Sequence, residues 1–311
     1  MPSIETHGLT KRYGNDVVAV DDLDLTVESG EVFGFLGPNG AGKSTTINML
    51  LDFVRPTAGE SRVLGHDPQT NPRAIRERTG VLPEATGFYD GDTARDHLQF
   101  ATAMKRTTDD PDALLERVGL ADAADRPVSG FSKGMRQRLG LAIALVGSPD
   151  LLILDEPLGG LDPSGARLLR EVVRNERDRG AAVFFSSHIM DQVETVCDRV
   201  GIMHDGRLVA VDTIDALHAQ SATPETVSLS VETAPQGVTD QLAAISGISE
   251  ATAENGSIRI TCPDPAAKTD AIARLDEEGV PILDIDTEAS SLEEVFLTIT
   301  DDSDTAGANR V

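Results

Sequence analysis

The stretch that decides the fold of this chain reads Gly37-Pro38-Asn39-Gly40-Ala41-Gly42-Lys43-Ser44. Its spacing, two glycines with four residues between them and then lysine and serine, is typical of a phosphate-binding loop. The apolar run 32–36 precedes it and reads as a strand, and the run 43–51 follows it and reads as a helix. A chance glycine-rich turn is the alternative, but the strand and the helix stand where a phosphate loop needs them. The stretch therefore predicts an α/β nucleotide-binding domain.

The residue types of this loop indicate how it would hold ATP. Glycines let the backbone wrap closely around phosphate oxygens, and successive N–H groups at a helix N-terminus present partial positive charge to them. Lys43 would place a full positive charge near the β and γ phosphates, and the Ser44 hydroxyl would coordinate Mg2+. We therefore expect ATP and Mg2+ as cofactors, held by Gly37, Pro38, Asn39, Gly40, Ala41, Gly42, Lys43, Ser44 and Thr45.

Two carboxylates end a second apolar run. Residues 151–154 read as a buried strand, and Asp155 and Glu156 follow it directly. Asp155 is suited to hold Mg2+, directly or through water, and Glu156 is suited to orient the attacking water or accept its proton. A surface turn that carries two acids is the alternative, and the phosphate loop elsewhere in the chain disfavours it. The sequence thus predicts ATP hydrolysis with Glu156 and Lys43 as catalytic residues.

His188 is a third candidate catalytic residue. It follows the apolar run 183–187, which reads as a strand. In an α/β domain the end of this strand lies near the same crevice, where a neutral imidazole can bond the γ-phosphate. A packed or surface histidine is the alternative interpretation.

The remaining pattern alternates strands with helices. Apolar runs at 23–27, 32–36, 151–154, 183–186 and 200–203 are typical of strands covered on both faces, as in a parallel sheet. Pro163 after Asp162 favours a helix that runs to about residue 179, with Gly180 as its C-cap. The segment from about 90 to 147 favours helix throughout, with breaks, so we expect a helical subdomain there.

The character of the chain changes near residue 219. Small and polar residues predict a linker over 219–225. Beyond it we expect strands at 227–231, 257–261 and 282–287 and helices at 266–278 and 291–299. This pattern predicts a small α+β accessory domain over 226–300 after an ATP-binding domain over 1–218. The polar tail 301–311 is expected to be disordered.

The formal net charge of -25 is extreme for a chain of 311 residues. So negative a surface disfavours general nucleic-acid binding through phosphate neutralisation and docking on anionic lipid by charge alone. A cytoplasm of high salt concentration explains the composition, because salt screens the mutual repulsion of carboxylates. We therefore expect a halophilic protein that does not bind nucleic acid; an ordinary acidic protein is the alternative.

Cysteine content and hydropathy set further limits. The two cysteines, Cys197 and Cys262, form no pattern of a disulfide framework or a zinc cluster. The longest apolar stretch, 139–147, is too short to cross a bilayer, which takes about 20 residues. The first residues are polar and do not read as a signal peptide. A cytosolic location is expected, at a membrane only where another protein holds the chain there.

At this point the motifs resemble a known family. Over about residues 4–217 the chain is similar to the nucleotide-binding subunits of ABC transporters. Residues 131–138 resemble the ABC signature, whose commonest form is LSGGQ, with departures at Lys133 and Met135 that are familiar in exporter-type subunits. Residues 158–162 resemble the D-loop, His188 the switch histidine, and Tyr13 the aromatic residue that stacks on adenine.

The resemblance implies a mechanism and two partners. Two cassettes pair head to tail with ATP between them, as a homodimer or with a related subunit, and they drive a membrane-spanning permease. Ser132 and the Gly134 backbone N–H would contact the γ-phosphate bound by the other subunit, in trans. Because the signature precedes a helix, its N-terminal dipole can face phosphate. A plain N-cap role for Ser132 is the alternative, and both roles are compatible.

One position departs from the family pattern. Glu84 stands where the Q-loop normally has glutamine. A carboxylate can offer an oxygen to Mg2+ but cannot donate as an amide does, so we expect Glu84 to approach the metal or its water; a solvated loop carboxylate is the alternative. By resemblance, the segment 86–96 would meet a cytoplasmic helix of the permease. Phe88 and Tyr89 either anchor that contact or pack the helical subdomain.

Three functions compete on these observations. The leading one is the ATPase subunit of an ABC transporter, and the signature variant and the C-terminal domain favour an exporter by analogy. The second is a non-membrane ABC ATPase in translation or DNA maintenance, which usually has two cassettes in one chain or long coiled coils. The third is a nucleotide-gated regulator that barely hydrolyses ATP, against which Glu156 and His188 argue.

Overall fold

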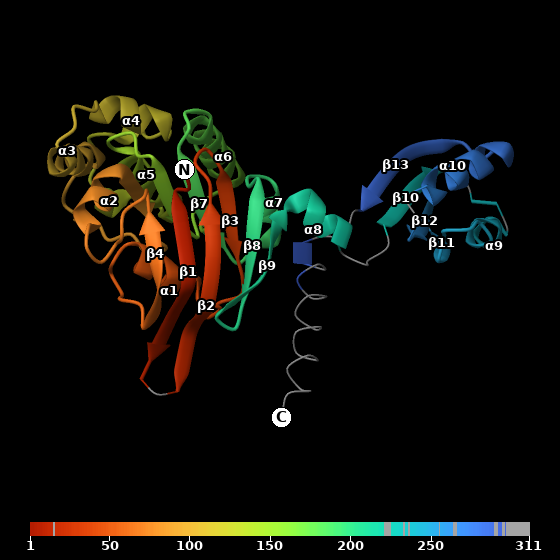
Figure 1. Ribbon diagram of the computed structural model, residues 1–311. Helices are drawn as coiled ribbons and strands as arrows, with labels where there is room; N and C mark the ends of the chain where they lie inside the picture. The colour runs from red at the N-terminus through yellow and green to blue at the C-terminus, as the bar shows by residue number, and fades with distance from the viewer. Residues whose placement is uncertain are drawn as a thin grey trace. The chain divides into compact units, whose positions relative to one another are not determined.

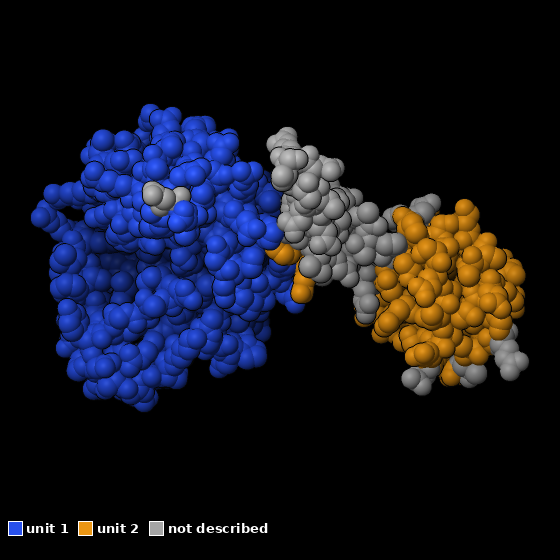
Figure 2. All heavy atoms as spheres, turned by 90° about the horizontal axis from the view of Figure 1, so that it is seen from below, with its two compact units in different colours: residues 1–214 blue, residues 215–311 orange. Residues whose placement is uncertain are grey.

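The structure is a computed structural model that describes residues 1–14, 16–220, 225–232, 234–235, 237–254, 256–263, 266–288, 292–293 and 296. The chain divides into two compact units, Met1–Ile214 and Asp215–Val311, which Figure 2 colours separately. Each unit is described by itself below.

A six-stranded sheet carries the first unit, in the order β5-β6-β7-β3-β8-β9. Neighbouring strands are parallel from β5 to β8, and β9 is antiparallel to β8. β3, β6 and β7 are buried along their whole length, which explains their near-continuous apolar sequences. The strands are β3 (Val32–Leu36), β5 (Thr79–Leu82), β6 (Leu151–Asp155), β7 (Ala182–Ser187), β8 (Arg199–His204) and β9 (Arg207–Thr213).

A second, antiparallel sheet has the order β2-β1-β4. Its strands are β1 (Ile4–Tyr13), β2 (Val17–Val27) and β4 (Ala58–Val63). The prediction that 23–27 joins the parallel sheet is wrong. Leu23 and Leu25 are buried while Asp24 and Thr26 are exposed, so one face of this strand meets the core and the other meets solvent. Both sheets contribute to one apolar core, from Leu23 and Leu25 of β2 to Phe33 of β3.

Some helices of the first unit begin at a side chain that caps them, and others do not. α1 (Lys43–Leu50) follows β3 and the phosphate loop. Before α6 (Pro163–Asp178), the Asp162 carboxylate accepts a hydrogen bond from the Gly165 N–H. Arg179 is the C-cap of α6, and Gly180, at φ 99°, is the residue after it, so the cap lies one residue earlier than predicted. The other two helices near the sheet are α2 (Pro72–Arg78) and α7 (Met190–Glu194).

Three helices form the group expected from the segment 90–147. They lie together beside the sheet, as Figure 1 shows. They are α3 (Ala94–Lys105), α4 (Pro111–Arg117) and α5 (Lys133–Leu145), and two 3-10 turns, η1 (Ala121–Ala123) and η2 (Val128–Gly130), come between α4 and α5. A capping box at Thr93 begins α3, because its hydroxyl and the Asp96 carboxylate each accept a backbone N–H of the other residue.

The second unit is a four-stranded antiparallel sheet in the order β11-β12-β10-β13. Alternate residues of β10 and β12 pack in a core with α9 and α10, which is the α+β pattern that the sequence predicts. Its elements are β10 (Glu225–Val231), α9 (Val238–Ala243), β11 (Glu250–Glu254), β12 (Ser257–Cys262), α10 (Ala267–Glu277) and β13 (Ile282–Glu288).

Some elements predicted for this region lie partly or wholly outside the described residues. α8 (Ile214–Gln220) runs into the stretch expected as a linker, and 221–224 lie outside the described residues. The expected helix 291–299 falls mostly outside them, with helical backbone at 292–293 and 296, and the tail 301–311 lies wholly outside. No helix among the described residues has the length and apolar character needed to span a membrane.

Candidate functional site

Two glycines give the phosphate loop its shape. Gly42 has a φ of 106° and is the N-cap of α1. A Cβ at Gly42 would lie 2.4 Å from the Ala19 carbonyl oxygen of β2, closer than a Cβ comes to a carbonyl oxygen. Gly40 also has a left-handed backbone, at φ 87°. The loop therefore folds back against β2 and brings the N-terminus of α1 to an open cavity.

This cavity has a volume of about 140 Å³ and unites residues from distant parts of the chain. The loop and the first turn of α1 form one side of it, and two carboxylates face them. The parallel sheet explains the meeting, because the carboxyl ends of β3 and β6 lie at the same edge. Its lining consists of Ala19, Asn39, Gly40, Gly42, Lys43, Ser44, Thr45, Glu84 and Glu156.

Lys43 is a buried cation at the centre of this arrangement. Its Nζ donates to the Gly37 carbonyl at 2.6 Å and to the Pro38 carbonyl at 3.2 Å. The same Nζ lies 3.8 Å from Glu156 Oε1. Burial lowers the pKa of Lys43, and the carboxylates of Glu156, Asp155 and Glu84 oppose that shift. The loop thus holds a positive charge within reach of phosphate oxygens and of the acid pair.

The Glu156 side chain lies between the other two predicted catalytic residues, Lys43 and His188. Its Oε2 lies 2.8 Å from Nδ1 of His188, while its Oε1 faces Lys43. Its backbone has a φ of 49°, in the left-handed region that costs a residue with a side chain roughly 1–2 kcal/mol. Such strain persists where the surrounding structure holds it, as at many active sites. The fold places this carboxylate between a cation and an imidazole.

Asp155 has the chemistry of a magnesium ligand. Burial raises its pKa, and the carboxylates of Glu156 and Glu84 raise it further, while the hydroxyls of Ser186 and Ser44 lower it. Its Oδ1 is buried and has no hydrogen-bond partner among the described residues. A divalent cation would satisfy that oxygen.

The donor set fits Mg2+ better than a metal that needs an all-protein cage. The described residues contain no group of three or more His, Cys, Asp and Glu side chains able to hold a metal. Mg2+ usually takes one or two protein ligands and completes its shell with water and substrate phosphates. Asp155 and Ser44 supply a carboxylate and a hydroxyl of this kind.

Comparison with known proteins identifies the family. Residues 20–159 match the family model described as ABC transporter. The chain is 42% identical over 212 residues to the bacitracin transport ATP-binding protein BcrA of Bacillus licheniformis, covering 66% of this chain and 68% of that protein. It is 35% identical over 310 residues to the daunorubicin/doxorubicin resistance ATP-binding protein DrrA of Streptomyces peucetius, covering 96% and 92%. The chain belongs to the ATP-binding subunits of ABC transporters.

A solved structure agrees with this assignment. The structure of an ATP-binding subunit of an ABC transporter matches 70% of this chain and 92% of its own, with 30% identity and a TM-score of 0.65. The predicted fold class and family are thus confirmed, and this ABC subunit binds and hydrolyses ATP. A non-membrane ABC ATPase, the runner-up on the sequence, is not favoured.

Other predicted site residues of the ABC subunit lie apart from the cavity. Tyr13 is 44% exposed at the end of β1, with Lys11 Nζ 5.0 Å from its ring centroid, and it does not line the cavity. Ser132 and Gly134 begin α5 and do not line it either. The Ser132 hydroxyl accepts a hydrogen bond from the Met135 N–H at 3.2 Å, which is the N-cap geometry.

Two residues around the site escaped the sequence reasoning. Ala19 lines the cavity, and its carbonyl faces Gly42, but an alanine at the start of a strand has no sequence signal for such a role. Gln137 stands within the signature segment, and its buried amide donates to the Pro157 carbonyl at 3.1 Å. Only the packing of α5 against the end of β6 reveals this contact.

Proposed function

We propose that this ABC subunit hydrolyses MgATP within a homodimer that sandwiches two nucleotides, and thereby drives export through a separate permease. The observation that carries the proposal is Glu156, which contacts both Lys43 and His188 at the rim of the phosphate cavity. Binding of ATP closes the dimer, and hydrolysis reopens it, so that the energy of binding becomes movement in the partner.

Each residue of the cavity has a distinct task in this scheme. The loop N–H groups and Lys43 would bind the phosphates, and Asp155 with Ser44 would hold Mg2+. Mg2+ neutralises charge on the β and γ phosphate oxygens when it is bound. Glu156 accepts the proton of the attacking water, and His188, at 2.8 Å, orients its carboxylate. Tyr13 at the exposed end of β1 offers its ring face to adenine.

Glu84 extends the acidic side of the cavity. It lines the cavity and acts electrostatically on both Lys43 and Asp155, so its carboxylate lies within the field of the metal site. We assign it a contact with Mg2+ or with a water of the metal shell. Glu84→Gln should then change the Mg2+ concentration needed for hydrolysis, and an unchanged dependence would contradict this role.

The signature segment would complete the site of a second copy. Ser132 is exposed at the N-terminus of α5, where the helix dipole and free N–H groups favour an anion. Because neither Ser132 nor Gly134 lines the cavity of its own subunit, their proposed phosphate lies on the partner. The head-to-tail homodimer satisfies both subunits at once.

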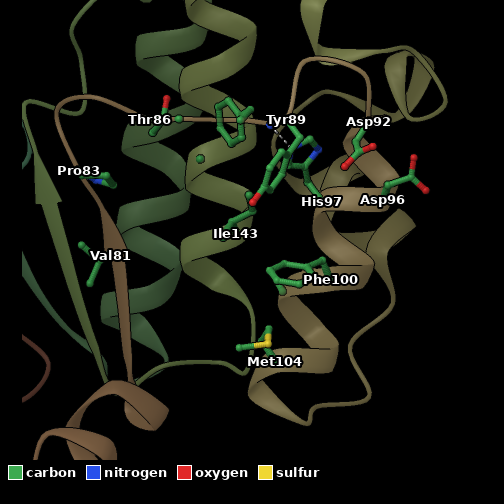
Figure 3. Close-up of a pocket in the computed structure, with 14 residues that line it drawn as sticks. Val81, Pro83, Thr86, Tyr89, Asp92, Asp96, His97, Phe100, Met104 and Ile143 are labelled. Carbon is green, nitrogen blue, oxygen red and sulfur yellow. Dashed lines mark hydrogen bonds between the residues drawn. The ribbon is translucent and has the colours of Figure 1, made fainter.

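An apolar groove of about 650 Å³ fits the permease contact. Phe88 and Tyr89 line it from the loop after β5. Phe100 and Met104 line it from α3, and Figure 3 shows them with Tyr89. Phe88 packs edge-on against His97 of α3, so it contributes to the helical subdomain. Tyr89 is 75% exposed, so its side chain is available to contact the permease. An amphipathic cytoplasmic helix of the permease would bury this apolar surface. That contact would hold the subunit at the cytoplasmic face of the membrane.

The names of two relatives support the proposed direction of transport. BcrA is named for bacitracin transport and DrrA for resistance to daunorubicin and doxorubicin. The DrrA match extends over 310 residues and so includes both units of this chain. Export of a small toxic compound is therefore the transport that we propose.

The role of Glu156 is tested by a single substitution. Glu156→Gln keeps the size and shape of the side chain but removes its negative charge and its basicity. We expect the ATPase rate to fall by roughly 10²- to 10⁴-fold, the usual contribution of a general base, while affinity for MgATP is retained. Steady-state phosphate release and nucleotide binding measure the two effects. Equal rates in wild type and variant would favour the nucleotide-gated regulator instead.

The groove proposal is tested with a pair of exposed phenylalanines. Phe100 in the groove is 65% exposed, and Phe53, which does not line the groove, is 63% exposed, so the pair is matched. Phe100→Glu should abolish recovery of the subunit with permease-containing membranes, because a charge enters an apolar contact. Phe53→Glu should leave that recovery intact, and neither change should lower ATP binding. Equal recovery of the two variants would exclude the groove.

A further inference from the structure

Gln137 is a buried amide that links α5 to the catalytic end of β6. It is 5% exposed. Its Nε2 donates to the Pro157 carbonyl at 3.1 Å and lies 3.5 Å from the Glu156 carbonyl, at the limit of a hydrogen bond. A buried amide is costly unless its hydrogen bonds are made. The Pro157 and Glu156 carbonyls therefore give the buried amide of Gln137 its hydrogen-bond partners.

The backbone that Gln137 contacts is the strained one. Glu156 stands at φ 49°, and that conformation needs support from its surroundings. The Glu156 N–H donates to the Ser186 carbonyl of β7, and the Glu156 carbonyl accepts from the Gly159 N–H in the same turn, both at 3.1 Å. Gln137 adds a side-chain contact from a third element, α5. The orientation of the Glu156 backbone decides where its carboxylate points.

The start of α5 packs on the same turn a few residues further along the chain. A Cβ at Gly134 would lie 3.2 Å from the Gly160 carbonyl oxygen, and a Cβ at Gly160 would collide with the Lys133 side chain at 2.5 Å. The first turns of α5 thus lie against residues 156–160 at two places. Within this packed region, Gln137 is the α5 side chain that contacts the Glu156 backbone.

We propose that Gln137 is a positioning residue for hydrolysis, which aims the Glu156 carboxylate by holding the backbone of Glu156 and Pro157 against α5. The inference rests on the proposed function of Glu156 as the base. It adds that the helix bearing the signature also sets the geometry of the base in its own subunit.

The test replaces the amide by an apolar side chain of similar length. Gln137→Met should lower kcat for ATP by about 10- to 100-fold, the usual cost of a misplacement of about 1 Å. KM and the affinity for MgATP should stay within about twofold, because the phosphate loop is untouched; a loss of binding would raise KM instead. Gln69→Met, at an exposed glutamine that does not line the cavity, is the matched control and should change nothing.

A double variant separates positioning from structural support. In a Glu156→Gln background, Gln137→Met should cause no further loss of the residual rate, because the carboxylate that it aims is gone. Gln137→Asn keeps a buried amide but draws its nitrogen back by one methylene, and it should also lower kcat with KM unchanged.

Each remaining outcome overturns one idea and not the other. If wild type hydrolyses ATP and Gln137→Met hydrolyses it equally fast, the positioning role is wrong while the proposed function stands. If both Gln137 variants lose kcat, MgATP affinity and thermal stability together, or if the losses with Glu156→Gln add, the amide only supports the fold and the proposal is wrong. If wild type itself fails to hydrolyse ATP, the proposed function fails first.

Discussion

At the scale of single residues, the site is a set of buried charges that the fold holds at a cost. Lys43 and Asp155 are both buried, and burial shifts the pKa of each toward its neutral form. The negative charge of Asp155 partly opposes the lowering of the Lys43 pKa. Such tension is common where binding of a charged ligand is the purpose of the site.

Asp155 gives a prediction for stability against pH. Its pKa is raised in the fold, so its protonated form stabilises the protein fully below the unfolded pKa, and that stability is lost as pH rises through the folded pKa. At neutral pH the ionised carboxylate therefore costs stability. Without Mg2+ and nucleotide, Asp155→Asn should raise the melting temperature at pH 7, by about 2–4 °C for each kcal/mol gained.

The pH series supplies the control for this prediction. The difference in melting temperature between wild type and Asp155→Asn should shrink toward about pH 4, where an unfolded aspartate is half protonated. The same variant should lose Mg2+-dependent hydrolysis. A difference that does not vary with pH would show that the buried charge is not its cause.

At the scale of elements, most strands and helices follow from local pattern, and the exceptions have physical causes. Runs 32–36 and 183–186 became β3 and β7 because both faces of a central parallel strand are buried. The run 23–27 joined a different sheet, which its alternation of apolar and polar residues shows in hindsight. The strand β11 (Glu250–Glu254) escaped prediction because it pairs small alanines with glutamates and threonine.

The start of α5 allows its two proposed roles to be separated. Ser132→Ala removes the N-cap and should cost about 1 kcal/mol of stability as well as ATPase activity. Ser132→Asp keeps an effective N-cap, so stability should be retained, but its negative charge would face the γ-phosphate of the partner and hydrolysis should fall. Thermal unfolding and phosphate release measure the two effects. Full activity in Ser132→Asp would contradict the contact in trans.

At the scale of the whole molecule, the main feature is the large negative net charge. The net charge of -25 is not concentrated in the site, where Lys43 lies among three carboxylates. Repulsion between so many surface carboxylates opposes compaction and weakens with salt. We hold to the proposal that the chain is adapted to high salt.

The salt response tests that proposal directly. The Debye length falls from about 30 Å at 0.01 M to about 3 Å at 1 M ionic strength. The melting temperature should therefore rise steeply and continuously from low salt to molar KCl. Sucrose at matched osmolality is a control that leaves charge unscreened. A flat response to KCl would remove the halophilic interpretation.

The sequence by itself determined the chemistry: a phosphate loop, a strand that ends in Asp155 and Glu156, and a histidine after the next strand. The spacing of residues within each motif is enough to predict this chemistry, because the motif itself contains both the glycines that shape the backbone and the side chains that react. Only the tertiary structure decided which groups meet. Three contacts show this: His188 lies 2.8 Å from Glu156, the Ala19 carbonyl lies against Gly42, and Gln137 donates to the Pro157 carbonyl. Their partners are between 20 and 32 positions apart in the chain.

That division has a physical reason. Side-chain identity fixes what a group can donate, accept or ionise, and a short window of sequence reveals it. The distance between two groups depends on how whole strands and helices pack, which is set by burial of apolar surface summed over the core. From the sequence alone, Gln137 is one more polar residue on a helix; only that packing places it against the backbone of Glu156, the proposed catalytic base.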